Sequence, residues 1–183
     1  AAWAGQFTPH VALEGEDGLM LDVTGCAHLF AGEDAMAGQV IRQLRRRGMT
    51  PRLGLADTPG AAWAVARYGQ GHPILPPGGQ KNALAELPVA ALRLPAATVE
   101  DLQRMGLGVI GALYPMPRAG LAARYGMELA MQLDRALGDS PEPITPQPHR
   151  DPYSERLAFA EPIGLAEDLT LALRELLQRL ARR

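Results

Sequence analysis

Two short alternating runs near the N-terminus constrain the fold of this chain more than any other feature. Apolar residues alternate with polar or small ones over residues 11–14 and again, apart from Met20, over residues 19–24. A period of two is the pattern of a β-strand. Residues 15–18 are rich in turn formers and join the two runs, so the sequence predicts a β-hairpin. At its turn Asp17 is followed by Gly18, whereas a second acid at that place would indicate a metal site.

Three acidic residues, Glu16, Asp17 and Asp22, lie on this predicted hairpin. Two-metal phosphoryl chemistry needs carboxylates that converge on ions about 4 Å apart. Asp17 and Asp22 are five positions apart, so on one strand they face opposite sides. The spacing therefore favours a structural interpretation, in which Asp17 forms the turn and Asp22 faces solvent or caps locally, over a metal site.

The residues that follow predict further helices and a strand. Residues 33–47 predict a helix, because two acids stand at its start, three arginines stand at its end and Gly48 stops it. Residues 52–56 predict a short strand. Residues 60–68 predict a second helix, which residues 57–59 cap with a proline near the first turn. We expect a small α+β sheet with helices on one face.

The arginines at the end of the first predicted helix form a basic cluster, which comprises Arg42, Arg45, Arg46 and Arg47. Such a cluster can bind phosphate groups. More often it is a solvated helix end, and we favour that interpretation from the sequence.

The second half of the chain changes in composition. Residues 80–138 predict short helices separated by prolines and glycines. Within them, residues 102–113 read as helix, tight glycine turn and helix. Such a hairpin can offer backbone N–H groups to a DNA phosphate, or it can be a plain αα-turn, and the sequence leaves both open. Residues 139–152 hold five prolines and predict an extended linker. Residues 153–159 then predict a strand and residues 165–182 an amphipathic helix whose leucine stripe is expected to be core.

Composition and charge exclude several classes of protein. The net charge of −2 lacks the basic excess of strong nucleic-acid binders, so any DNA contact is expected to be local. The four histidines and single cysteine lack metal-ligand spacing, and no nucleophile elbow or phosphate-binding loop is present. One cysteine and the lack of a long apolar run favour a cytoplasmic protein. Because the chain starts without Met, we expect a piece of a longer protein.

Several motifs, in order, resemble Y-family (UmuC-like) lesion-bypass DNA polymerases. Residues 21–25 (LDVTG) and 52–56 (RLGLA) are similar to palm strands of that family. Residues 87–89 with 102–113 resemble the thumb, and residues 136–138 before the proline linker resemble the passage to the little finger. The resemblance implies a partial palm at 1–79, a helical thumb at 80–138, a linker at 139–152 and the start of an α+β little-finger domain at 153–183.

Within the family, residues 24–30 (TGCAHLF), 56–64 (ADTPGAAWA) and 159–163 (FAEPI) look most like the ImuB branch. That branch is regarded as a non-catalytic scaffold of a bacterial DNA-damage mutagenesis system. The resemblance implies primer–template DNA as a partner, together with a RecA-like ImuA protein, an error-prone C-family polymerase and the sliding clamp.

Departures from the active family fit that branch. Asp17 matches the first acid of an Asp-Glu pair and Gly18 replaces the second, so Asp17 is expected to be vestigial. Pro59 stands where active members carry a lysine near the nucleotide phosphates, and residues 94–96 lack a Gly-x-Gly of the first thumb hairpin. The resemblance also places another metal-binding Asp before Ala1. Catalytic residues, metal and cofactors are therefore expected to be absent.

Three functions remain open at this point. The first is a catalytically degenerate, DNA-binding scaffold in translesion synthesis. The second is an active lesion-bypass polymerase, with Mg²⁺, that recruits Glu16 or Asp22. The third is a protein-interaction adaptor that never touches DNA. The candidate contacts to the DNA backbone are Arg93, Arg104, Gly106, Gly108, Gly111, Arg118 and Arg124.

Overall fold

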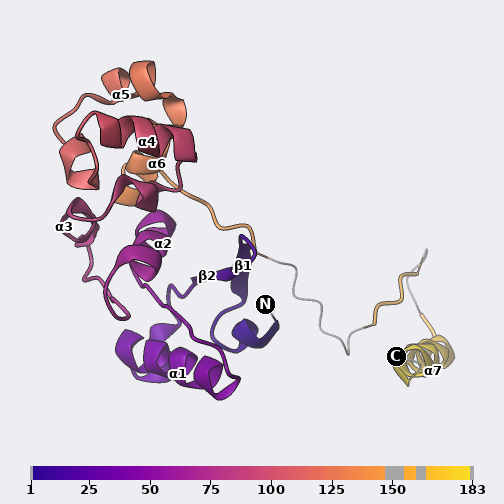
Figure 1. Cartoon of the computed structure of the whole chain (residues 1–183). Helices are drawn as coiled ribbons and strands as arrows, with labels where there is room; N and C mark the ends of the chain where they lie inside the picture. The colour runs from indigo at the N-terminus through magenta and orange to yellow at the C-terminus, as the bar shows by residue number, and fades with distance from the viewer. Residues whose placement is uncertain (1, 147–154, 160–163, 182–183) are drawn as a thin grey trace. The chain divides into compact units, whose positions relative to one another are not determined.

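The computed structural model describes residues 2–146, 155–159 and 164–181 (Figure 1). The chain divides into two compact units, Trp3–Gln147 and Pro148–Arg183. Seven α-helices and a two-stranded antiparallel sheet lie within the described residues, so the predicted α+β class is confirmed. Among these residues, no helix has both the length and the apolar character that crossing a membrane requires.

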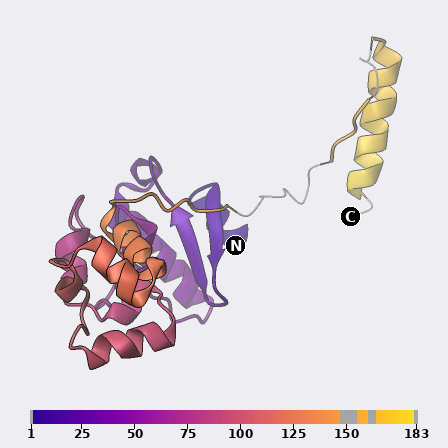
Figure 2. The ribbon, with the colours of Figure 1, turned by 90° about the horizontal axis from the view of Figure 1, so that it is seen from above.

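The predicted hairpin is confirmed. Strand β1 (His10–Glu14) pairs antiparallel with β2 (Gly18–Asp22), and the register places Glu14 opposite Gly18. Figure 2 shows the two strands side by side. The short helix η1 (Ala2–Gln6) precedes the hairpin and η2 (Ala27–Phe30) follows it.

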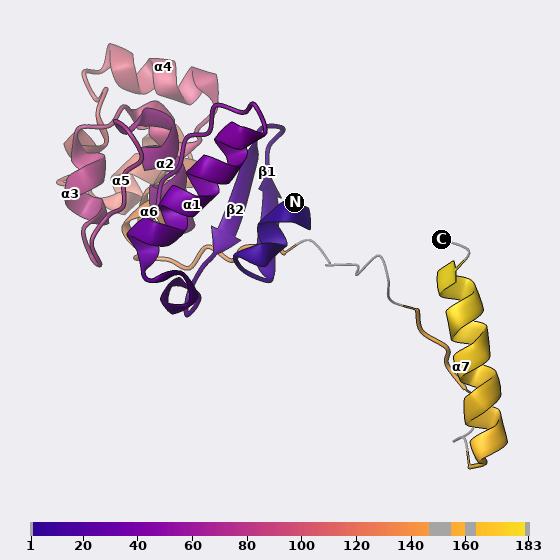
Figure 3. The ribbon, with the colours of Figure 1, turned by 90° about the horizontal axis from the view of Figure 1, so that it is seen from below.

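Helix α1 (Glu33–Arg46) confirms the helix predicted over 33–47. Figures 1 and 3 together show that it covers one face of the hairpin. Met36 and Ala37 of α1 are buried, as is Phe7, whose ring lies 5.4 Å from that of Phe30. These apolar side chains give the N-terminal part of the unit a small core of its own.

The strand predicted over 52–56 is wrong apart from one residue. Leu55 makes a single parallel bridge to Ile74, through Leu55 N–H to Pro73 O and Leu75 N–H to Leu55 O. The partner segment cannot extend the ladder, because Pro73 has no N–H and prolines 76 and 77 follow. The residues have the propensity for a strand, but the partner segment lacks the donors that a longer ladder needs.

Helix α2 (Pro59–Tyr68) confirms the helix predicted over 60–68, and its cap is the predicted one. The Thr58 side chain accepts a hydrogen bond from Ala61 N at 3.1 Å and donates one to Ala136 O at 2.9 Å. Pro59 occupies the first helical turn, where its missing N–H costs nothing. One threonine thus caps α2 and joins it to the last helix of the unit.

Short helices fill the remainder of this unit, as expected for 80–138. They are α3 (Gln80–Ala85), η3 (Val89–Leu92), α4 (Ala96–Arg104), η4 (Ile110–Leu113), α5 (Arg118–Tyr125) and α6 (Met127–Leu137). They share one core with α2, formed mainly by buried leucines and alanines. Helix α2 therefore packs with the helices that follow it, and the boundary at residue 79 stays a prediction.

The segment 102–113 differs from the predicted helical hairpin. Helix α4 ends at Arg104, and the second helix is only the four-residue η4. Between them Val109 forms an antiparallel bridge with Pro88, which uses Val89 N–H and Ile110 N–H. The N–H groups of Val89 and Ile110 therefore bond across this bridge, to Gly108 O and Leu87 O, and not within a helix.

The second unit contains α7 (Ala166–Ala181), which confirms the amphipathic helix predicted over 165–182. The strand predicted over 153–159 is wrong where it is described, since residues 155–159 form neither strand nor helix; residues 153–154 lie outside the described part. The leucine stripe is exposed rather than core, with Leu173 60% and Leu177 65% exposed, because the described residues of this unit supply no second layer.

Candidate functional site

The acid at the turn of the hairpin is bound by an arginine from α2. Arg67 donates to both carboxylate oxygens of Asp17, with its Nη1 at 3.2 Å from Oδ2 and its Nη2 paired to Oδ1. The guanidinium of Arg67 also lies 5.0 Å from the centre of the Trp63 ring. The hydrogen bond and the charge of Arg67 lower the pKa of Asp17 below its ordinary value. Asp17 is therefore an exposed acid whose two carboxylate oxygens already have Arg67 as a partner.

The position after Asp17 has no room for a side chain. A Cβ built on Gly18 would lie 2.6 Å from the backbone oxygen of Glu14 and 3.2 Å from its Cβ. Glu14 is the cross-strand partner of Gly18, so the contact is made by the hairpin itself. A carboxylate at this position requires the backbone of the turn to shift.

Asp22 caps locally, as the spacing predicted. Its Oδ1 accepts a hydrogen bond from Thr24 N at 3.0 Å. Hydrogen bonds from Thr24, first from its side chain and then from its backbone, lower the pKa of Asp22. Its backbone oxygen accepts from Thr8 Oγ1. Asp22 lies at the opposite end of β2 from the Asp17 turn, and Glu16 is exposed on that turn.

Asp22 does not converge with the two acids of the turn, Glu16 and Asp17. Across the residues that the structure describes, no group of three or more histidine, cysteine, aspartate or glutamate side chains is arranged to hold a metal ion. Of the acids at the turn, only Asp17 matches the first acid of the Asp-Glu pair in the family that the sequence resembles. Both of its carboxylate oxygens face Arg67.

A cleft of about 350 Å³ lies beside Pro59. Strand β2, the start of α2 and residues 142–146 line it. Its ionisable residues are three acids, Asp22, Asp57 and Glu142, and one histidine, His10. Of the three carboxylates, that of Glu142 is paired with Arg93, and that of Asp22 accepts a hydrogen bond from Thr24 N.

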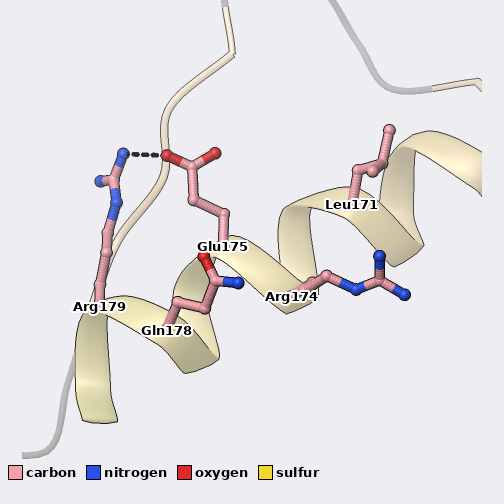
Figure 4. A pocket seen from close by; sticks show the side chains of 5 residues that line it. All are labelled: Leu171, Arg174, Glu175, Gln178 and Arg179. Carbon is pink, nitrogen blue, oxygen red and sulfur yellow. Dashed lines mark hydrogen bonds and ion pairs between the residues drawn. The ribbon is translucent and has the colours of Figure 1, made fainter. Parts of the chain in front are cut away.

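A second hollow lies on α7 and is shown in Figure 4. Leu171, Arg174, Glu175, Gln178 and Arg179 line it, and an ion pair of 2.6 Å joins Arg179 to Glu175. Because all five residues belong to one helix, this is an open helix face and not an enclosed site.

Two of the arginines expected to contact DNA are instead held by acids of the same unit. Arg93 pairs with Glu142 at 2.6 Å and with Glu14 at 3.7 Å, and its side chain is only 18% exposed. Arg118 pairs with Asp134 at 2.5 Å and approaches Asp139 at 4.0 Å. Both side chains join neighbouring segments of the unit.

The other two arginines lie at one surface. Arg104 is 69% exposed and pairs with Glu100 and Asp101 of its own helix. Arg124 is exposed, lies 3.4 Å from the sulfur of Met105 and 5.4 Å from the centre of the Tyr125 ring, and has no acidic partner among the described residues. The end of α4 and the end of α5 therefore meet at Met105 and Arg124.

The three candidate glycines have different surroundings. A Cβ added to Gly106, whose φ is 77°, or to Gly108 would meet nothing within 4 Å, so both glycines face open space. A Cβ on Gly111 would lie 2.9 Å from Ala85 O, so Gly111 lets η4 approach α3 closely. The open loop 105–109 thus lies next to Arg124, and Gly111 packs inside the unit.

Sequence reasoning missed Arg67 and Glu142. Arg67 is 50 residues from Asp17, and Glu142 is 49 residues from Arg93. Neither pairing follows a local spacing rule, and Glu142 lies in a proline-rich segment whose composition predicts a linker. Only the folded arrangement reveals these partners.

Comparisons with known proteins agree with the resemblance found in the sequence. No protein-family model matches the chain. Over 167 residues, or 91% of this chain, the sequence is 48% identical to protein ImuB from two strains of Caulobacter vibrioides. A DNA polymerase IV from Dehalococcoides mccartyi is 25% identical over 142 residues, or 75% of this chain.

The expected similarity to ImuB and, more weakly, to a Y-family polymerase is confirmed. The chain spans 36% of the length of each of these relatives. The similarity therefore concerns a portion of each relative and not its whole length.

Proposed function

We propose that this chain comprises a partial palm, a helical thumb, a linker and the start of the little-finger domain of a polymerase-like, catalytically degenerate scaffold that binds primer–template DNA in translesion synthesis. Its similarity to ImuB and to a DNA polymerase IV supports a role in the response to DNA damage. The hairpin, the helix α2 and the cluster of short helices follow one another in the order expected of a palm and a thumb.

The observation that carries the proposal is the state of the Asp17 turn. Phosphoryl transfer depends on positioning and on charge stabilisation by metal ions held on carboxylates. Here Arg67 neutralises the first carboxylate, and Gly18 has no room to supply the second. Pro59 brings neither charge nor donor to the start of α2. Losing these groups lowers a polymerase rate by orders of magnitude.

The DNA contact is proposed at the surface where Arg124 meets the loop 105–109. Arg124 is exposed and lacks an acidic partner in the described residues, and Gly106 and Gly108 leave the loop backbone accessible. Arg104 lies at the same end of α4. Arg93 and Arg118 act through their ion pairs, which join neighbouring segments of the unit, and Gly111 acts through its packing on α3.

Primer extension with Mg²⁺ or Mn²⁺ tests the catalytic part of the proposal. The protein is expected to add no nucleotides above the background of an Asp17→Ala variant. Incorporation that is robust and is lost in Asp17→Ala would contradict the proposal and favour an active polymerase. Glu16→Gln and Asp22→Asn would then identify the recruited acid.

Binding to a fluorescent primer–template across a salt series tests the DNA contact. Each phosphate contact contributes about 0.9 to the slope of log K against log salt. Arg124→Ala is expected to lower the slope by about 0.9, whereas Arg179→Ala, which removes an equal charge from an ion pair on α7, is expected to leave it unchanged. If the protein does not bind even at low salt, the adaptor function replaces this proposal.

The partners follow from the same resemblance. We propose a cytoplasmic assembly with a RecA-like ImuA protein, an error-prone C-family polymerase and the sliding clamp. Co-elution of each purified partner with the protein in size-exclusion chromatography tests this assembly one partner at a time. Elution of every partner at its own separate volume would contradict it.

A further inference from the structure

A basic surface at the C-terminal end of α1 lies outside the proposed DNA contact. We call it the α1 basic surface; it comprises Arg42, Arg45, Arg46, Arg47 and His72. Residues 42–52 contain five arginines and no acid. The four arginines of the surface are exposed, and none forms an ion pair with an acid in the part of the chain that the structure describes. This is unusual in a chain whose net charge is −2.

The fold brings His72 to this surface from a separate loop. The loop is fixed by the backbone bonds of Leu55 with Pro73 and Leu75. The ring of His72 is oriented by Leu53, whose backbone N–H donates to Nδ1 at 3.3 Å. Since Nδ1 accepts a hydrogen bond, the neutral ring carries its proton on Nε2.

That proton faces another donor. His72 Nε2 lies 3.4 Å from Nη2 of Arg45. An arginine has donors only, so two donors converge and no acceptor lies between them in the described structure. An oxygen of an anion placed beside both groups would accept from both. The geometry is that of a phosphate site formed by a guanidinium and an imidazole.

The dipole of α1 accounts for only part of this arrangement. Cations are favoured at the C-terminus of a helix, which explains why arginines end α1. It does not explain why a histidine from another loop presents its N–H to one of them. Arg47 is also held in place, because its guanidinium lies 4.8 Å from the centre of the Trp3 ring and Trp3 donates to Gln43 at 2.8 Å. The surface is therefore partly ordered before any ligand binds.

We propose that the α1 basic surface binds the phosphate backbone of the DNA at a second place, with Arg45 and His72 sharing one phosphate and Arg46 contacting the next. The inference rests on the proposed DNA-binding function, which makes a polyanion with regularly repeated phosphates the expected ligand. It adds a contact on the opposite part of the unit from the helices α4 and α5, which Figure 1 shows at the other end from α1. The test therefore uses a substrate with single-stranded DNA beyond the duplex.

The experiment compares salt slopes for a primer–template with a long single-stranded template arm. Arg45→Ala/Arg46→Ala is expected to lower the slope by about 1.4 to 1.8, because each of the two phosphate contacts contributes about 0.7 on single-stranded and about 0.9 on duplex DNA. His72→Asn keeps an acceptor for Leu53 N–H and removes the Nε2 donor, so it is expected to lower the affinity severalfold without a loss of fold. The control Arg174→Ala/Arg179→Ala removes the same charge from α7 and is expected to match the wild type.

Two results overturn the inference in different ways. If the wild type binds and the Arg45→Ala/Arg46→Ala variant keeps the wild-type slope, the second contact is wrong and the first stands. If Arg124→Ala and the wild type alike fail to bind at low salt, the proposed function itself fails. Because all the substituted arginines are exposed, we expect each variant to keep the fold. Circular dichroism of each variant checks this.

Discussion

Arg93 and Glu142 form an ion pair of 2.6 Å across 49 residues of sequence, and both side chains are largely buried, with 18% and 14% exposed. Arg93 comes directly after η3 and has a left-handed backbone, with φ of 57°. Glu142 lies in the segment after α6. The pair therefore attaches that segment to the helical part of the unit, and Glu14 of the hairpin approaches the same guanidinium at 3.7 Å.

Arg93→Ala is expected to destabilise the first unit by about 2 kcal/mol, because a charged hydrogen bond is removed and a largely buried carboxylate is left unpaired. Hydrogen exchange should show the change most strongly over residues 139–146. Arg104→Ala removes an exposed pair on a single helix and is expected to cost less than about 0.5 kcal/mol. Equal effects of the two substitutions in chemical denaturation would contradict the assignment.

Arg67→Gln is expected to raise the pKa of Asp17 toward its ordinary value, because the hydrogen bond and the charge that lower it are removed. The signal of the Asp17 carboxyl carbon, followed by NMR during an acid titration, measures the midpoint. Since the folded pKa is the lower one, the pair stabilises the fold above the unfolded pKa and the contribution disappears as the pH falls through the folded pKa. Exposure makes that contribution small. An unchanged midpoint would exclude the pairing in solution.

Thr58→Ala is expected to destabilise the unit by about 1–2 kcal/mol, because the substitution removes the N-cap of α2 together with the bond to Ala136 O. Thr58→Ser keeps the hydroxyl group and should recover most of the stability. Urea denaturation followed by circular dichroism compares the three proteins. A serine variant as unstable as the alanine variant would assign the effect to the methyl group instead.

Gly111→Ala and Gly108→Ala form a matched pair. At Gly111 the new methyl group would lie 2.9 Å from Ala85 O, so α3 and η4 must separate, at an expected cost of about 1–3 kcal/mol. At Gly108 the methyl group meets nothing within 4 Å, so we expect a change within about 0.5 kcal/mol. Thermal denaturation of both variants checks the difference, and similar midpoints would contradict it.

Rules about neighbouring residues, such as periodicity, turn residues and helix caps, predict the helices and strands that those residues determine. The hairpin follows from its period and turn, α1 from its charge order and Gly48, and α2 from Thr58 and Pro59. The prediction of a strand over 52–56 is wrong because a strand also needs a partner, and Pro73 limits that partner to one bridge. The leucine stripe of α7 is predicted correctly as a stripe, but its burial depends on a second layer.

The candidate site is predictable only in part. The resemblance identifies Asp17 as a match to the first acid of an acidic pair, and Gly18 and Pro59 as departures from its second acid and from a lysine. It does not identify Arg67 as the partner of Asp17, because no local spacing rule connects two residues that are 50 positions apart. Arg93 and Arg124 look alike as cations in the sequence, yet tertiary contacts bury one and leave the other accessible.

The contact between Gly18 and Glu14 has a consequence for how this turn could acquire a new side chain. An acid at position 18 is not an isolated change, because the turn has to shift before the side chain can be accommodated. A substitution at position 18 therefore has to be combined with changes in residues 14–17 that move the backbone of the turn. In this hairpin the order of substitutions, and not only their identity, limits which sequences the fold can reach.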